Sequence, residues 1–166
     1  MTEPGIEKVL PRGTADYGSV VTVHFDGACQ PPKGGGVATY GYTIDGDRFH
    51  EEGHGPAVAP WAPHATNNVA EYVAAIRALE WLREHQYKGP VLVLGDSQLV
   101  IRQMKGEYEV RAEHLRQYHQ HLHALVRSFS EVEFVWVARE ENARADALSK
   151  LALEEIGHEA RRYRPT

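Results

Sequence analysis

The sequence of 166 residues predicts an α/β domain, built on a five-stranded mixed sheet with helices on both faces. Three β-rich segments follow one another early in the chain, which favours an antiparallel arrangement of the first strands. Residues 91–94 are apolar throughout, and residues 20–25 carry apolar side chains on both faces, as strands covered on both faces of a sheet do. Helical periodicity alternates with the later strands, so the expected order of elements is β-β-β-α-β-α-β-α.

In the first half of the chain, strands are expected at residues 20–25, 37–44 and 48–52. Asp45-Gly46 is a strong signal for a two-residue hairpin turn between the second and third strands. Residues 53–65 are rich in Pro, Gly and Ala, which excludes a regular helix and indicates an irregular surface segment. A long helix is expected from Asn67 to His85, because apolar residues recur along one face there.

In the second half, strands are expected at residues 91–94 and 132–137, and helices at about 97–104, 112–129 and 142–156. Residues 1–18 carry Pro and Gly without periodicity and are expected to form a flexible N-terminal extension. A single folded domain then spans residues 19–156, and residues 157–166 form a small basic tail.

Composition limits the class of protein. The net charge of −5 argues against non-specific nucleic-acid binding, although bound cations could supply positive charge at a nuclease site. The only cysteine, Cys29, excludes an internal disulfide and suits a reducing compartment. No apolar run approaches the roughly 20 residues that cross a bilayer, and the N-terminus lacks the apolar core of a secretory signal. We therefore expect a cytoplasmic protein without a membrane partner.

Four carboxylates stand where predicted elements begin or end, namely Asp26, Glu71, Asp96 and Asp146. Each has an ordinary structural explanation. Asp26-Gly27 could form a turn, and Glu71 could complete a capping box that begins at Asn68. Asp96-Ser97 could cap a helix, and Asp146 could interact with a helix dipole.

The positions of the same four acids also suggest a common site. Asp26 and Asp96 are expected at the carboxyl ends of strands, which meet at one edge of a parallel sheet. The helix starts that carry Glu71 and Asp146 can pack near that edge. Crowded carboxylates repel one another unless cations hold them, and oxygen ligands suit Mg²⁺ or Mn²⁺. Two such ions about 4 Å apart are a known arrangement for phosphodiester hydrolysis.

The segments FDGAC, ATNNVAEYVAAIRALEWL, GDSQLVIRQMKG and WVAREENARADALSKLA resemble, in order and spacing, the motifs of type 1 ribonucleases H. The resemblance covers roughly residues 20–153, and it implies an RNase H-like fold in which residues 19–156 are the catalytic domain. It implies a metal-dependent endoribonuclease that hydrolyses the RNA strand of an RNA/DNA hybrid, leaving 5′-phosphate and 3′-hydroxyl ends. We expect the enzyme to act as a monomer.

The resemblance also implies roles for individual residues. Two Mg²⁺ or Mn²⁺ ions would be held by Asp26, Glu71, Asp96 and Asp146, with Asp26 shared between the ions. Thr66 and Asn67 match positions that contact the DNA strand, and Asn68, Ser97 and Gln98 match positions near the RNA strand. Asn142 and Cys29 are also expected to contact substrate, with Cys29 as a small buried residue rather than a nucleophile.

The chain departs from the family pattern in three places. The loop AREEN lacks the histidine that many members carry, and Arg139 is expected to take part of its catalytic role. The loop QPPKGGG replaces Asn-Pro-Gly, so that Lys33 is expected to reach a phosphate instead. The basic handle of some bacterial members is absent, which predicts weak, salt-sensitive substrate binding.

Two other functions stay open at this point. The first is a nuclease on the same fold that acts on double-stranded RNA or as an exonuclease, and the second is a catalytically inactive nucleic-acid-binding module.

Among the tryptophans, Trp81 and Trp136 are expected to pack in or near the core, whereas Trp61 is a candidate stacking surface.

Overall fold

A computed structural model describes residues 19–164, so the extension expected at residues 1–18 lies outside the described part of the chain. Five strands form one mixed sheet in the order β3-β2-β1-β4-β5, which confirms the predicted fold class. The strands are β1 (Val21–Gln30), β2 (Val37–Asp45), β3 (His50–Pro56), β4 (Val91–Gly95) and β5 (Val132–Trp136). The helices are α2 (Asn67–Glu84), α3 (Gln98–Met104), α4 (Glu113–Val126) and α5 (Ala143–Ala160), with short 3-10 helices η2 (Arg139–Asn142) and η3 (Arg161–Tyr163).

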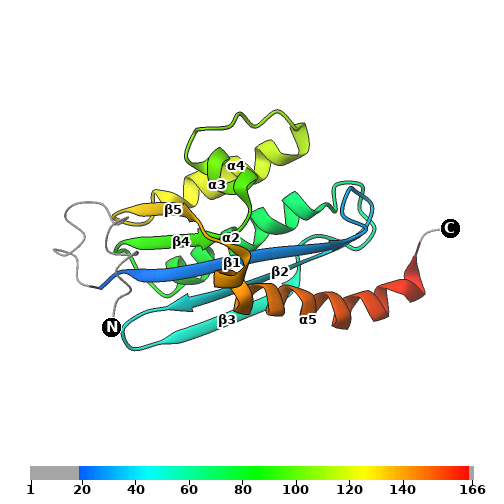
Figure 1. The fold of residues 1–166 in the computed structure, drawn as a ribbon, viewed down its shortest axis with the longest axis horizontal. Coiled ribbons are helices and arrows are strands. Elements are labelled where there is room, and N and C mark those ends of the chain that lie inside the picture. Colours follow the sequence, from blue (N-terminus) through cyan, green and yellow to red (C-terminus); the bar gives the residue numbers. More distant parts are fainter. Residues whose placement is uncertain (1–18, 165–166) are drawn as a thin grey trace.

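The helices form two layers on opposite faces of the sheet (Figure 1). On one face α2 packs against β1 and β2, and α4 packs in turn against α2. On the other face α5 lies across β1, β2 and β3. The core between the sheet and α2 includes the fully buried side chains of Val23, Phe25, Tyr72 and Leu79. In the described part of the chain, no helix combines the length and apolarity that a membrane span requires.

The central strand β1 is longer than expected. It pairs in parallel with β4 only as far as Phe25, which lies opposite Gly95. Its antiparallel pairing with β2 continues through Gln30, opposite Val37. The expected end of the strand at Phe25 is therefore wrong, because pairing with β2 keeps the small residues after Asp26 extended. Residues 26–30 consequently have a neighbouring strand on one side only.

Two further local predictions are wrong. Asp45 pairs with His50, so the hairpin between β2 and β3 has a four-residue loop closed by a 3.0 Å hydrogen bond from the Gly46 N–H to the Phe49 carbonyl. β3 continues to Pro56, through residues that were expected to be irregular. It does so because it is an edge strand, where glycine and proline are tolerated.

The helix α5 ends at Ala160 rather than near residue 156, so the expected basic tail begins inside the helix.

The predicted packing of the tryptophans is correct only in part. Trp81 is half-buried against the core, but Trp136 is 46% exposed.

Two glycines allow the helices of both layers to approach the sheet closely. A Cβ atom at Gly27 would lie 2.4 Å from the backbone nitrogen of Glu71 in α2. A Cβ atom at Gly41 would lie 2.5 Å from the backbone nitrogen of Ser149 in α5. Gly41 pairs with Asp26 across the two strands. The absence of side chains at these two positions therefore sets the distance from β1 and β2 to both α2 and α5.

We expect Gly41→Ala to destabilise the protein by about 1–3 kcal/mol, because the added methyl group collides with the backbone of α5. Gly157→Ala, in α5 itself, is the matched control. A Cβ atom built at Gly157 would have nothing within 4 Å. That variant should gain roughly 0.5–1 kcal/mol from the higher helix propensity of alanine. Urea denaturation measures both, and equal stability of the two variants would contradict the close packing at Gly41.

Candidate active site

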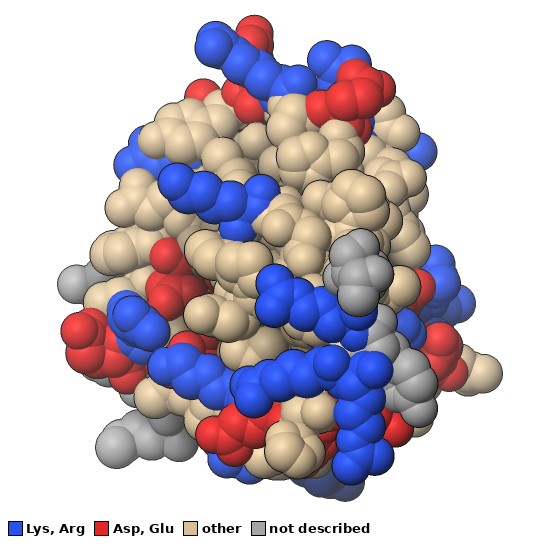
Figure 2. Space-filling model, turned by 90° about the vertical axis from the view of Figure 1, so that its right-hand side faces the viewer, with Lys and Arg blue, Asp and Glu red and all other residues tan. Residues whose placement is uncertain are grey.

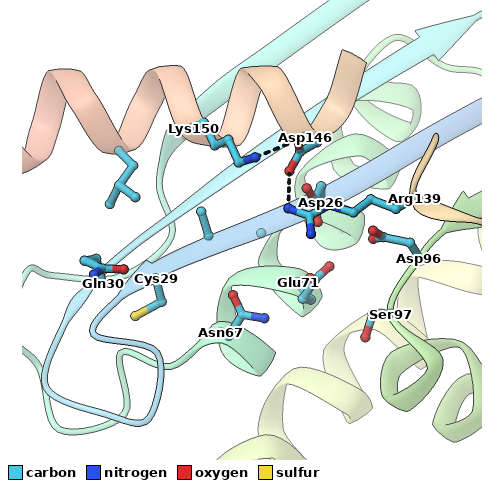
Figure 3. Close-up of a pocket in the computed structure, with 13 residues that line it drawn as sticks. Asp26, Cys29, Gln30, Asn67, Glu71, Asp96, Ser97, Arg139, Asp146 and Lys150 are labelled. Carbon is cyan, nitrogen blue, oxygen red and sulfur yellow. Dashed lines mark ion pairs between the residues drawn. The ribbon is translucent and has the colours of Figure 1, made fainter. Parts of the chain in front are cut away.

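The four acids gather where β4 ends beside the longer β1 (Figure 3). Asp26 is the first residue of β1 beyond its last pair with β4, and Asp96 directly follows β4. Glu71 comes from α2 on one face of the sheet, and Asp146 comes from the first turn of α5 on the other. Because β1 has an open edge here, side chains from both helical layers reach the same place.

The ordinary explanations fail for three of the four acids. The N-cap of α2 is Thr66, whose hydroxyl accepts a hydrogen bond from the Val69 N–H at 3.2 Å, so Glu71 is not part of a capping box. The N-cap of α3 is Ser97 rather than Asp96. Asp26 lies within a strand and not in a turn. Only Asp146 occupies a position that a helix dipole would also favour.

Asp26, Glu71 and Asp96 form a tight cluster. One carboxylate oxygen from each lies within 4.8 Å of the others, and both Asp26 and Glu71 are buried. Burial, contact with Asp146 and the charge of Asp96 raise the pKa of Asp26 to about 7. Burial, followed by the charges of Asp26 and Asp96, raises the pKa of Glu71 well above its ordinary value. The cluster therefore holds negative charge at a considerable electrostatic cost.

Asp146 lies beside Asp26, but its charge is balanced by cations. The Lys150 Nζ is 3.0 Å from one carboxylate oxygen, and an Arg139 nitrogen is 4.0 Å from the other. Burial acts to raise the pKa of Asp146, but the contacts with Lys150, Asp26 and Arg139 outweigh it and hold the pKa below its ordinary value. Nearby, Arg144 donates to both carboxylate oxygens of Glu52 in β3, at 2.8 and 2.6 Å, and so anchors the start of α5.

The cluster fits a divalent cation. The Glu71 Oε2 atom is buried and has no hydrogen-bond partner among the described residues. A buried acceptor of this kind needs a partner, and an oxygen-only donor set suits hard divalent ions. A cation would also relieve the repulsion among the carboxylates. Asp26, Glu71 and Asp96 are therefore the residues that could hold a metal ion, with Asp146 adjacent.

Asn142 holds Asp96 and β1 together through hydrogen bonds. Its side-chain nitrogen donates to the Phe25 carbonyl at 2.9 Å and to the Asp96 carboxylate at 3.3 Å. The side chain is buried and holds Asp96 in position, while the expected contact of Asn142 with substrate stays a prediction. The Trp136 indole N–H donates to the Asp96 carbonyl at 3.2 Å, which fixes the same residue from the side of β5.

The residues expected to contact substrate divide into two groups. Asn67, Ser97 and Cys29 line the pocket around the acids, as does Arg139, which was expected to take a catalytic role. Thr66, Asn68, Gln98 and Lys33 lie outside the pocket lining. Lys33 is close to the site nevertheless, because it forms an isolated β-bridge with Thr66 at the start of α2.

Cys29 is part of the wall of the pocket rather than a reactive group. Its thiol donates to the Pro31 and Ala65 carbonyls at 3.1 and 3.2 Å. Burial raises the pKa of the Cys29 thiol to about 11, so that the thiolate is scarce at neutral pH. The structure agrees with the expectation of a small buried residue.

Five pocket residues were not among the expected site residues, namely Gly27, Ala28, Gln30, Lys150 and Leu153. Lys150 stands four residues after Asp146 in a predicted helix, and this spacing is a signal that could have revealed the ion pair. Gln30 could not be found in this way, because β1 was expected to end at Phe25. Trp61, the candidate stacking surface, donates its indole N–H to the Ala160 carbonyl at 3.1 Å, and its role in stacking stays a prediction.

Comparison with known proteins identifies the family. A family model described as Reverse transcriptase-like matches residues 49–152. Ribonuclease HI of Halobacterium salinarum is 33% identical over 141 residues, covering 84% of this chain and 67% of that protein. The crystal structure of RNase H1 from the same organism has a TM-score of 0.70 at 34% identity, covering 81% of this chain and 98% of that one.

Two other solved structures are similar. The N-terminal RNase H domain of a Mycobacterium tuberculosis protein has a TM-score of 0.72 at 28% identity, covering 86% of this chain and 99% of that one. The full-length bifunctional protein from that organism is matched over only 26% of its length. LC11-RNase H1 in complex with an RNA/DNA hybrid has a TM-score of 0.71 at 30% identity, covering 82% of this chain and 98% of that one. The chain belongs to the type 1 ribonuclease H family.

Proposed function

We propose that this ribonuclease H hydrolyses the RNA strand of RNA/DNA hybrids at the cluster of Asp26, Glu71 and Asp96. The observation that carries the proposal is the convergence of three carboxylate oxygens within 4.8 Å around a buried, unpartnered Glu71 oxygen. Such a cluster is an arrangement for holding cations beside a phosphodiester. The hybrid bound to the similar LC11-RNase H1 supports this substrate class.

The metal ion that fits these ligands best is Mg²⁺ or Mn²⁺, because all the donors are oxygens. Asp26, Glu71 and Asp96 would hold one ion, and Asp26 and Asp146, which contact each other, would hold a second. When bound, such ions lower the pKa of an attacking water and stabilise the leaving oxygen of a phosphodiester.

The other residues of the site hold the acids in place. Asn142 and Trp136 fix Asp96 through its side chain and its backbone. Lys150 and Arg139 orient the Asp146 carboxylate. These contacts keep the acids in position before substrate arrives, which is how a preorganised site lowers the barrier of a reaction.

The pocket also offers polar groups to the substrate. Asn67 and Ser97, at the starts of α2 and α3, line it together with Gln30 of β1. Short amide and hydroxyl side chains are suitable partners for phosphate oxygens and for the 2′-hydroxyl that distinguishes RNA from DNA. Arg139, with 70% of its side chain exposed, adds a positive charge beside Asp146. Because an arginine stays protonated, it can bind phosphate but cannot carry a proton.

The substrate is tested with a panel of RNA/DNA, RNA/RNA and DNA/DNA duplexes in Mg²⁺, in Mn²⁺ and in EDTA. We expect internal cleavage of the RNA strand of the hybrid, with 5′-phosphate ends and no cleavage in EDTA. Equal cleavage of RNA/RNA duplexes, or shortening only from the ends, would favour the double-stranded RNA or exonuclease alternatives. Hybrid binding without any cleavage would identify an inactive binding module.

Asp26→Asn should reduce cleavage by on the order of a thousandfold, because the residue is the shared member of the acid cluster. The same variant should be more stable than the wild type in EDTA, by roughly 1–2 kcal/mol, since it removes a buried charge from a repulsive cluster. Glu109→Gln, at a side chain that is 80% exposed, is the control for loss of an acid. Full activity of Asp26→Asn in Mg²⁺ would refute the role of the cluster.

The stability difference should depend on pH. Because the folded protein raises the pKa of Asp26 from 3.8 to about 7, the native state binds this proton more tightly than the unfolded state does. Protonated Asp26 therefore stabilises the metal-free wild type fully below about pH 4. This contribution to the free energy of unfolding is lost as the pH rises toward about 7. Thermal denaturation of the two proteins in EDTA should show their Tm values diverging across this window.

Arg139→Ala should lower kcat by about tenfold and change KM by less than about twofold, because Arg139 acts on Asp146 and the reacting phosphate. Arg83→Ala, at an exposed position at the far end of α2, controls for the loss of a positive charge. Steady-state kinetics on the hybrid measures both parameters. A raised KM with an unchanged kcat would assign Arg139 to substrate binding alone.

A further inference from the structure

The end of α5 concentrates positive charge in an otherwise acidic protein. Residues 160–164 contain three arginines and no acid, whereas the whole chain has a net charge of −5. Arg161, Arg162 and Arg164 are all exposed. Figure 2 shows Lys and Arg side chains gathered in a band across the lower part of the face that includes this end of the molecule. We call these three residues the C-terminal arginine cluster.

The cluster lies at the end of the helix that forms one wall of the active-site pocket. Lys150 and Leu153 of α5 line that pocket. Arg161 is the C-cap of α5 and follows Lys150 by eleven residues, which is about three helical turns. At 1.5 Å per residue, the two positions are about 16 Å apart. The positive charges of this helix therefore stand at two places, Lys150 beside Asp146 and the C-terminal arginine cluster at its end, with Glu154, Glu155 and Glu159 between them.

The cluster is tied to the rest of the fold through Trp61. The indole N–H of Trp61 donates to the Ala160 carbonyl at 3.1 Å, and the guanidinium carbon of Arg164 lies 5.1 Å from the ring centroid. The backbone N–H of Trp61 donates to the Gly36 carbonyl at 2.9 Å. These contacts join the end of α5 to the loop between β1 and β2, which carries Lys33, and Figure 1 shows both at the same end of the molecule.

The position of the cluster favours one kind of ligand. Arginine guanidinium groups match the geometry of phosphate oxygens and remain charged at any ordinary pH. A distance of about 16 Å corresponds to roughly five phosphates along one strand of a duplex, at about 3.4 Å per phosphate. A duplex whose RNA strand lies over Asp26 and extends along α5 would therefore bring its backbone to the cluster.

We propose that the C-terminal arginine cluster binds the sugar–phosphate backbone of the hybrid several base pairs from the cleaved bond. The inference rests on the proposed function of the pocket. The contact is to backbone phosphates, so it adds affinity without sequence preference. Lys33 lies in the loop between β1 and β2 that Trp61 joins to the end of α5.

The test compares a triple variant, Arg161→Gln with Arg162→Gln and Arg164→Gln, with a control that loses the same charge elsewhere. The control replaces Arg48, Arg83 and Lys88 by Gln. These exposed residues lie in the β2–β3 hairpin, in the last turn of α2 and just after α2, at the opposite end of the molecule (Figure 1). Neither set includes a pocket residue. Circular dichroism should give both variants the Tm of the wild type within a few degrees.

Cleavage of a hybrid about 18 base pairs long is measured over a range of salt concentrations. We expect the cluster variant to raise KM by at least about fivefold near 50 mM salt, with kcat within about twofold of the wild type. The slope of log KM against log salt should become shallower by about one to three, because each lost phosphate contact removes roughly 0.9. A cluster variant whose KM and slope match those of the control would overturn the proposal.

Binding measurements separate this inference from the proposed function. Fluorescence anisotropy with the same hybrid is repeated with both variants in an Asp26→Asn background, where cleavage plays no part. Weaker binding by the cluster variant alone supports the surface even if no duplex is cleaved, and equal binding overturns it. The proposal would also be overturned if the cluster variant lost binding to phosphatidylserine vesicles while its binding to the hybrid was unchanged.

Discussion

The site depends on a difference in length between two neighbouring strands. β4 ends at Gly95 opposite Phe25, while β1 continues for five residues to Gln30. The backbone edge exposed by this difference is where helices from opposite faces of the sheet can meet. Gly27 and Gly41 then allow α2 and α5 to lie against the strands without a side chain between them. Sheet register and close packing together bring acids from three other segments of the chain to Asp26.

The electrostatics of the site follow from this geometry. Asp26 and Glu71 are buried next to each other and to Asp96, and within residues 19–164 neither forms an ion pair with a positive side chain of the kind that balances Asp146. Such an arrangement stores repulsion that a bound cation releases. Asp146 differs from the other three acids, because the ammonium group of Lys150 already balances its charge. Asp26, Glu71 and Asp96 need a bound cation for the same purpose.

Most of the fold could be predicted from local patterns, because helical periodicity and apolar strands are properties of short segments. The four acids could be identified because their residue types and spacing are specific to the family. The length of β1, the four-residue hairpin loop and the course of β3 could not be predicted, since pairing with β2 determines them. The same holds for Asn142, whose spacing resembles that of a substrate ligand but whose side chain is buried beneath Asp96.

The thiol of Cys29 has a consequence for redox chemistry. It lines the same pocket as the acids, yet it donates to two backbone carbonyls and burial keeps it protonated. Oxidants and alkylating reagents attack the thiolate form and require access to the sulfur. The only cysteine of the chain is therefore protected against both, and the pocket should keep its chemistry through oxidative stress that inactivates enzymes with exposed thiols.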